Sequence, residues 1–290
     1  MANIQTVGTE FVKSLSEELS QGTIELPALP DIALRIKNAL EDPDVSATQV
    51  AKVVGSDPVF SARLLKAANS VVLSGVGKPI TDIPTAVARI GFRMAHNIAV
   101  AIAVNQLMNA GVGGQLEADF KKLWRHSVNV AAYSFVIAKK MTKINPDKAL
   151  LGGLMHDIGK IYILSRTASD FPELCDDPAA LNTALRGWHT GVGSAILQNW
   201  DFDEELVMVA DEHELYDREV LGRADLTDVV LAANLFAHVA EQKLSPDDPA
   251  EQHWVAIGSF KRLNIDEASI AVIKDESREE VNSIIAALGS

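Results

Sequence analysis

The sequence predicts an all-α protein, folded as a two-lobed helical bundle. Ala, Leu and Val dominate a chain that is 48% hydrophobic but only 6% aromatic, a balance that favours helices over a sandwich or a barrel. Apolar residues recur at spacings of three and four, and no segment shows a sustained alternation of period two. Capping residues and prolines stand where helices would begin.

Three helices are predicted in the N-terminal part from their start signals. Ser46 and Gln49 form a capping box before VAKVV, and Ser56-Asp57-Pro58 supplies a cap and an early proline before VFSARLLKAAN. Thr81 or Asp82 caps a third helix that runs on through residue 104. Its apolar positions step by three and four: Val87, Ile90, Met94 and Ile98.

The glycines of GVGG at 111–114 mark the predicted boundary between the lobes, which are residues 1–112 and 113–243. The polar passage KLSPDDPAEQ then separates a helical tail over 244–290. Within the second lobe, the stretch FPELCDDPAALN is predicted to be a loop. The predicted helices of this lobe are 119–142, 146–165, 187–200, 203–215 and 225–242.

Charge and composition narrow the classes of partner. The formal net charge of −13 repels phosphate backbones and anionic lipid, so we expect neither a nucleic-acid nor a membrane partner. A small anionic ligand remains compatible, because a local cation can override the global field. One cysteine, Cys175, and an opening MANIQTVGTEF without signal-peptide features predict a cytoplasmic protein. The longest apolar run, near 98–104, is far short of the roughly 20 residues of a spanning helix.

Five histidines of the second lobe fall on five different predicted helices. Helix bundles build metal sites by pointing one ligand inward from each of several helices. Neutral imidazole and carboxylate together suit divalent Fe, Mn or Zn. For any one of these histidines, a hydrogen-bonded core role is the commoner alternative. The candidates are His126, His156, His189, His213 and His238, with Asp157 beside His156.

The stretch GGLMHDIGK at 152–160 places His156 and Asp157 in the predicted helix that opens at Asn145-Pro146. Adjacent helical residues point about 100° apart, so both side chains can reach one metal only if it lies between their directions. Lys160 falls on the face of Asp157. It could meet a substrate phosphate or neutralise Asp157. Arg125 is the alternative partner for that acid.

Other ionisable residues receive ordinary interpretations. Asp211, Glu212 and Glu214 are expected at a solvated helix end. His96 and His253 carry no pattern and are taken as structural or surface residues.

Several motifs resemble the HD superfamily of metal-dependent phosphohydrolases, and within it the HDOD branch, the HD-related output domains of bacterial signalling proteins. The resemblance covers roughly residues 20 to 242 and rests on motifs in a fixed order. In the first lobe these are LPALPDIALRI, SDPVFSARLLKAANS and PITDIPTAVARIGF; in the second they are LWRHS, GGLMHDIGK and HTGVGSAILQNW.

The resemblance implies an all-α fold with an HD-like second lobe, and it implies a ligand set. HD hydrolases bind metal through a first His, the His-Asp pair and a later Asp. His126, His156 and Asp157 match the first three, but Asn234 stands at the fourth position. Asp228 lies off the face of Asn234 and is a poor replacement.

The HD-GYP relatives, which hydrolyse a cyclic dinucleotide, add a further His and then a His-His pair. His189 matches the first, and Glu212-His213 stands in place of the pair. The GYP segment itself is absent from the sequence, which argues against that substrate.

The function implied by this resemblance is an HDOD-type regulatory module of signal transduction, without turnover, that binds a protein partner and could retain a metal or nucleotide site. The alternative is a divalent-metal phosphohydrolase acting on a nucleotide or another phosphoester, with Asp157 and Lys160 in catalytic roles. Neither the partner nor the oligomeric state follows from the sequence. The implied ligands of an Fe, Mn or Zn ion are His126, His156, Asp157, His189 and His213, with Glu212 and Asn234 as neighbours.

Overall fold

The structure is a computed structural model that describes residues 4–40, 42, 44–56, 58–69, 79–110, 116–220, 222–241, 257–276 and 278–288. Every regular element in these ranges is helical, so the predicted all-α class is confirmed. The glycines at 111–114 and the polar passage at 243–252 lie outside the described residues. The division of the chain at those two places stays a prediction.

The first group of helices contributes to the same apolar core as the second group. α2 packs against α3 and α7, and both α3 and α4 pack against α6. The predicted capping box is present, since Ser46 Oγ accepts from Gln49 N while the Gln49 side chain accepts from Ser46 N. The helices of this group are α2 (Asp31–Leu40), α3 (Ala47–Val54), α4 (Pro58–Ala68), α6 (Ile83–Ile90) and α7 (Phe92–Ala110), and α1 (Ile4–Gln21) precedes them in the chain.

The single helix predicted from residue 84 to 104 is wrong, because it is two helices. Asp82 caps α6, which ends at Gly91 with φ of 83°, a conformation that glycine adopts without steric cost. α7 then leaves at an angle of 108° to α6. Taken singly, no helix of the described ranges has the length and apolar character needed to cross a membrane. α6 and residues 92–107 of α7 reach that threshold only together, across this bend.

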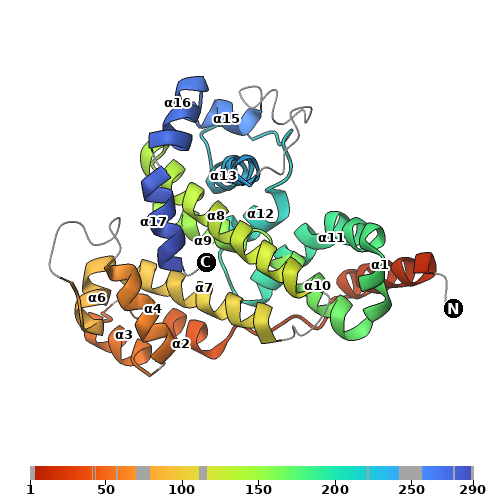
Figure 1. The fold of residues 1–290 in the computed structure, drawn as a ribbon, viewed down its shortest axis with the longest axis horizontal. Coiled ribbons are helices and arrows are strands. Elements are labelled where there is room, and N and C mark those ends of the chain that lie inside the picture. Colours follow the sequence, from red (N-terminus) through yellow and green to blue (C-terminus); the bar gives the residue numbers. More distant parts are fainter. Residues whose placement is uncertain are drawn as a thin grey trace.

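The second group of helices holds the histidines. α8 packs along α9 and α13, while α11 packs between α10 and α12 (Figure 1). The bounds are α8 (Glu117–Met141), α9 (Pro146–Met155), α10 (Ile158–Asp170), the 3₁₀ turn η1 (Pro172–Asp176), α11 (Pro178–Asn199), α12 (Glu204–Glu212) and α13 (Leu226–Ala240).

Two predictions for this group need correction. The stretch FPELCDDPAALN is not a loop, because it forms η1 and the first turn of α11, which Asp177 caps ahead of Pro178. The predicted helix 146–165 is interrupted at His156 and Asp157, so the pair lies between α9 and α10 rather than within one helix.

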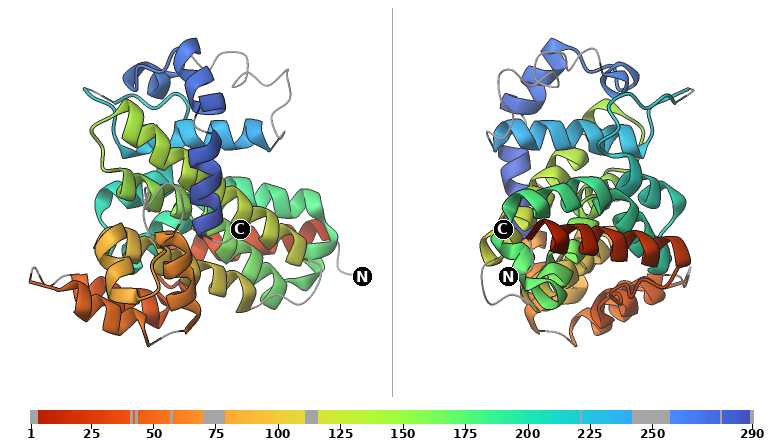
Figure 2. Two further views of the ribbon diagram at one scale, coloured as in Figure 1. Left: turned by 60° about the vertical axis from the view of Figure 1, so that its left-hand side comes forward. Right: turned by 90° about the vertical axis from the view of Figure 1, so that its right-hand side faces the viewer.

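The helices at the two ends of the described chain pack differently, since α1 lies against the second group whereas α17 contacts both groups (Figure 2). α1 packs against α11 and η1, and the Arg166 guanidinium of α10 bonds both carboxylate oxygens of Glu18 on α1. α17 packs against α4, α7 and α8. The C-terminal elements are α15 (Gly258–Arg262), α16 (Glu267–Ala271), the π-helical turn η3 (Val272–Glu276) and α17 (Arg278–Leu288).

Candidate metal centre

Four histidines converge on the carboxylate of Asp157, which is 1% exposed. His126 comes from α8, His156 precedes Asp157 between α9 and α10, His189 comes from α11, and His213 directly follows α12. All four histidines are buried. The distances from their Nε2 atoms to an Asp157 carboxylate oxygen are 3.9 Å for His126, 3.4 Å for His156, 3.7 Å for His189 and 3.3 Å for His213.

The interruption between α9 and α10 frees Asp157 for this role. Asp157 occupies the N-cap position of α10, with φ of −102° and ψ of 18°, yet its side chain makes no capping hydrogen bond. The carboxylate therefore turns inward toward the histidines instead of satisfying the helix terminus.

Gly159 allows α10 and α11 to approach each other closely. A Cβ at position 159 would lie 2.0 Å from the carbonyl oxygen of His189 and 2.7 Å from the backbone nitrogen of Gly193. Any larger residue would push the two helices apart, because both opposing atoms belong to the backbone. The glycine of the HDIGK stretch thus holds His189 near Asp157.

Backbone carbonyls fix the tautomers of three of the histidines. A carbonyl oxygen only accepts hydrogen bonds, so the Nδ1 atom facing it carries the hydrogen, and in the neutral ring the Nε2 lone pair points into the cluster. This is the ring arrangement of metal-ligating histidines. The Nδ1 contacts are His156 to Gly153 O at 2.7 Å, His189 to Leu185 O at 2.8 Å and His213 to Val209 O at 3.1 Å.

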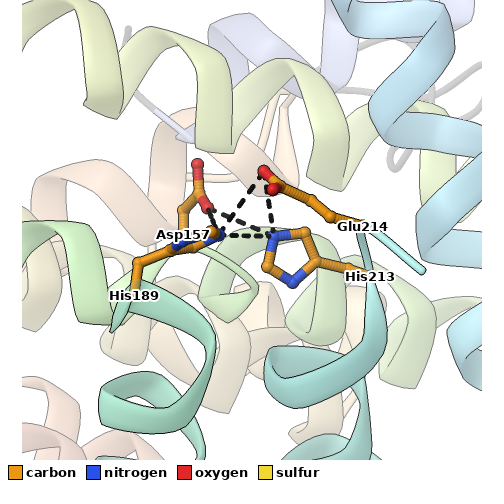
Figure 3. Close-up of side chains that lie close together, drawn as sticks. All are labelled: Asp157, His189, His213 and Glu214. Carbon is orange, nitrogen blue, oxygen red and sulfur yellow. Dashed lines mark hydrogen bonds and ion pairs between the residues drawn. The ribbon is translucent and has the colours of Figure 1, made fainter. Parts of the chain in front are cut away.

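Glu214 joins the cluster, contrary to its predicted place at a solvated helix end. One of its oxygens lies 3.4 Å from His189 Nε2 and 3.8 Å from His213 Nε2, as Figure 3 shows. The predicted neighbour Glu212 instead pairs with Arg218 at 2.8 Å. α12 ends at Glu212, and Glu214 lies two residues beyond that end.

Lys160 supplies a cation inside the cluster. Its Nζ lies 2.9 Å from Asp157 and 3.2 Å from Glu214. The sequence had left Lys160 or Arg125 as the partner of Asp157, and the structure places Lys160 there.

The charge states follow from these contacts. Burial raises the pKa of Asp157, but the charge of Lys160 and the contacts with His156 and His213 outweigh burial and hold that pKa well below its usual value. Burial also raises the pKa of Glu214, but its contact with His189 and the charge of Lys160 lower that pKa by more. Burial lowers the pKa of His156 to about 4. At neutral pH two carboxylates and one ammonium therefore share a pocket with a neutral His156.

The residues fit a divalent metal ion. Asp157, His189, His213 and Glu214 offer ligand atoms that all lie within 4.8 Å of one another, and so do His126, His156 and Asp157. The Nε2 atoms of His126 and His156 are buried without a hydrogen-bond partner in the described part of the chain. Imidazole and carboxylate donors of this kind suit divalent iron, manganese or zinc.

A cavity of about 340 Å³ opens beside the cluster. His126, Asp157, Lys160 and His238 line it, together with the polar side chains of Asp119, Lys122 and Asn182. Its apolar wall consists of Leu123, Leu164, Leu181 and Leu185. The volume lies in the range of small-molecule sites, so a ligand could reach the donors from this side.

Asn234 and Asp228 occupy different surroundings. Asn234 is 1% exposed, and its Oδ1 has no hydrogen-bond partner among the described residues. Asp228 instead accepts hydrogen bonds from Arg218, Ser259 and Arg262. These bonds commit Asp228 to a separate ion-pair network, in agreement with its rejection as a substitute for the missing ligand.

The helical bundle, the first histidine and the adjacent His-Asp pair define a protein of the HD type. The family model of the HDOD domain matches residues 26–216, and the chain belongs to the HDOD family. The resemblance drawn from the sequence motifs is thereby confirmed.

Solved structures with the same fold come from several bacteria. A protein of Shewanella amazonensis SB2B, provisionally assigned as a metal-dependent phosphohydrolase, has a TM-score of 0.82 and 25% identity over 98% of this chain and 99% of its own. An HDOD domain protein of unknown function from Geobacter sulfurreducens has a TM-score of 0.71 and 25% identity, covering 99% of this chain and 98% of its own.

A longer relative is known from sequence. An uncharacterized protein of Treponema pallidum (strain Nichols) is 24% identical over 273 residues, which are 90% of this chain and 50% of that protein. The chain thus spans about half the length of this curated relative.

Proposed function

We propose that this chain is an HDOD-type regulatory module of bacterial signal transduction that holds a divalent metal ion and does not turn over a substrate. The proposed metal site is supported by the convergence of four histidines on one buried carboxylate. The regulatory role is supported by membership of the HDOD family. A Marinobacter aquaeolei VT8 protein provisionally assigned to signal transduction shares the fold, with a TM-score of 0.62 and 17% identity over 99% of this chain and 66% of its own.

The ion would be held by a subset of six residues. Bound there, a divalent ion would supply Lewis-acid polarisation and a point of attachment for an anionic group. The candidates are His126, His156, Asp157, His189, His213 and Glu214.

The absence of turnover is proposed from Asn234. The HD pattern expects a charged carboxylate at this position, and an amide is neutral and a weaker metal ligand. The metal would then hold the helices of the second group in one arrangement, and a protein partner would recognise the helical surface in that arrangement.

A second candidate is a metal-dependent phosphohydrolase, and the cavity beside the donors favours it. Asp157 and Lys160 both line that cavity, so a phosphate entering from this side would meet the Lys160 ammonium. In that case Lys160 would orient the phosphate, while the apolar wall would hold the rest of the ligand.

Metal content and turnover, measured on the same preparations, test the two candidates. Protein purified without added metal is analysed for Fe, Mn and Zn, then assayed against phosphodiesters, phosphomonoesters and nucleotides with each metal added. We expect bound metal in the wild type, its loss in His156→Ala and no hydrolysis. His96→Ala, on α7 and outside the cluster, is the control that keeps the metal.

The outcomes separate the candidates cleanly. Hydrolysis that disappears in His156→Ala and survives in His96→Ala would establish the phosphohydrolase. A wild-type protein that neither retains nor rebinds any of the three metals would overturn both candidates.

A further inference from the structure

The last turn of α13 and the residue after it meet His126 on the side away from Asp157. Glu241, the C-cap residue of α13, places its carboxylate oxygens 3.3 and 3.4 Å from His126 Nδ1. His238, three residues earlier, stacks on the His126 ring with centroids 4.6 Å apart and planes inclined by 22°. His126 thus has Asp157 beyond Nε2 and Glu241 at Nδ1.

These three side chains offer ligand atoms within 4.8 Å of one another, which would also suit a second metal ion. The ring geometry argues against it. A metal ion lies close to the plane of each imidazole that binds it, along the nitrogen lone pair. The rings of His126 and His238 are stacked nearly parallel, so their planes do not meet at a common point between the donors.

The contact between Glu241 and His126 has a simpler consequence. A carboxylate only accepts hydrogen bonds, so the hydrogen of a neutral His126 ring resides on Nδ1. The Nε2 lone pair then faces Asp157 and the other donors. Glu241 does for His126 what backbone carbonyls do for His156, His189 and His213, but it brings a full negative charge.

Glu241 is itself held in place. Asn129 Nδ2 donates to a Glu241 oxygen at 2.7 Å, and Asn129 lies three residues after His126 on the same face of α8. The Glu241 side chain is 14% exposed, so the contact is sheltered from bulk water. One carboxylate therefore joins the end of α13 to two residues of α8.

We infer that Glu241 is a positioning residue of the metal centre, which fixes the tautomer of His126 and strengthens it as a ligand through its charge. The inference rests on the proposed metal site for its effect on affinity. It does not rest on that site for the tautomer, which is a property of the metal-free protein.

The tautomer is read first, by nitrogen NMR of histidine-labelled, metal-free protein, with the His126 signals assigned by comparison with His126→Gln. The expected result is a hydrogen on Nδ1 and none on Nε2 in the neutral ring. In Glu241→Ala this preference should be lost. A wild-type His126 that carries its hydrogen on Nε2 overturns the inference.

Zn²⁺ affinity is read second, by competition with a chromogenic chelator. Removing a carboxylate that orients a ligand histidine typically costs 10- to 100-fold in metal affinity, and we expect this loss in Glu241→Ala. Glu241→Gln keeps an acceptor but not the charge, so its loss should be smaller. Glu280→Ala is the matched control, since Glu280 is similarly sheltered, at 17% exposure, and pairs with Lys139 far from the centre.

The two measurements distinguish a failure of the proposed metal site from a failure of the role inferred for Glu241. If the wild type binds no Zn²⁺, the proposed function fails and the NMR result alone decides the role of Glu241. If the wild type binds Zn²⁺ and a folded Glu241→Ala protein binds it within twofold of the wild type, Glu241 does not position the ligand.

Discussion

The Nε2 atoms of His189 and His213 lie 3.4 Å apart, and the Nδ1 atom of each ring is bonded to a backbone carbonyl. In neutral rings two lone pairs would face each other across this gap, beside the carboxylates of Asp157 and Glu214. Such an arrangement is relieved by a cation placed between the donors. The first prediction follows from this pair.

Zn²⁺ should raise the thermal unfolding midpoint of the wild type by a few degrees at a concentration of about 100 times Kd, where binding adds about 2.7 kcal/mol. The double variant His189→Ala/His213→Ala should lose most of this increment, because it removes two donors. Differential scanning calorimetry with Zn²⁺ or with chelator measures it. His96→Ala should retain the wild-type increment, and an equal increment in all three proteins would contradict the prediction.

Replacing Lys160 by Met should destabilise the metal-free protein by about 3–5 kcal/mol, the usual cost of removing one partner from a buried ion pair. Asp157 and Glu214 would be left as neighbouring anions without their cation. Bound metal should recover part of the loss, because it neutralises the same carboxylates. Urea unfolding with and without Zn²⁺ provides the test.

Lys148→Met is the comparison, because Lys148 pairs with the largely exposed Asp203 and Glu205. It should cost about 1 kcal/mol or less. A Lys160→Met protein no less stable than Lys148→Met would show that the ammonium does not hold the two carboxylates.

Gly159→Ala should destabilise the protein by about 3 kcal/mol, the upper part of the range for overpacked cores, and should also weaken metal binding. The added methyl group would meet the backbone of α11 at His189 and Gly193, neither of which can rotate away. Gly187→Ala, in the same helix α11, meets nothing within 4 Å. That substitution should stabilise by up to about 1 kcal/mol, so chemical denaturation of the two variants should give opposite signs.

Acid should weaken the attachment of α1 through Glu18. The hydrogen bonds from Arg166 lower the pKa of Glu18 below its usual value, more than burial raises it. A lowered folded pKa means that this contribution is complete above the unfolded pKa of about 4.3 and is lost as the pH falls through the folded pKa. Glu18→Gln should therefore cost about 1.5–3 kcal/mol at pH 7 and progressively less below pH 4.

Urea unfolding of wild type and Glu18→Gln between pH 7 and pH 3 gives the two curves. Glu17→Gln is the neighbouring control, since the Glu17–Lys13 pair is exposed. If the free energies of unfolding of wild type and Glu18→Gln differ by the same amount from pH 7 to pH 3, the Glu18–Arg166 ion pair does not stabilise the fold as proposed.

Local signals in the sequence predicted much of the fold. The capping box at Ser46 and the cap at Asn145 give correct helix starts, because capping depends only on residues a few positions apart. The motifs likewise placed four histidines and Asp157 in one cluster.

Local signals in the sequence did not predict the interruption between α9 and α10. Leu150, Leu154 and Ile158 keep the spacing of four straight through it and are all buried. The apolar period therefore continues where the helix does not.

The residues missed at the centre depend on tertiary structure. Glu214 contacts His189 of α11, and Glu241 is 115 positions from its partner His126. Neither contact is encoded in a local sequence pattern. Acids flank His213 on both sides in the sequence, but the sequence does not decide which of Glu212 and Glu214 faces the histidines.

The packing of α17 on α4 and α7 has a consequence for biosynthesis. The helix that packs on α4 and α7 is the last described segment to leave the ribosome. Contacts between residues so distant in sequence form late and slow folding. The contacts of α17 with α4 and α7 therefore form only after residues 278–288 have emerged, and a chaperone would act on the chain in that interval.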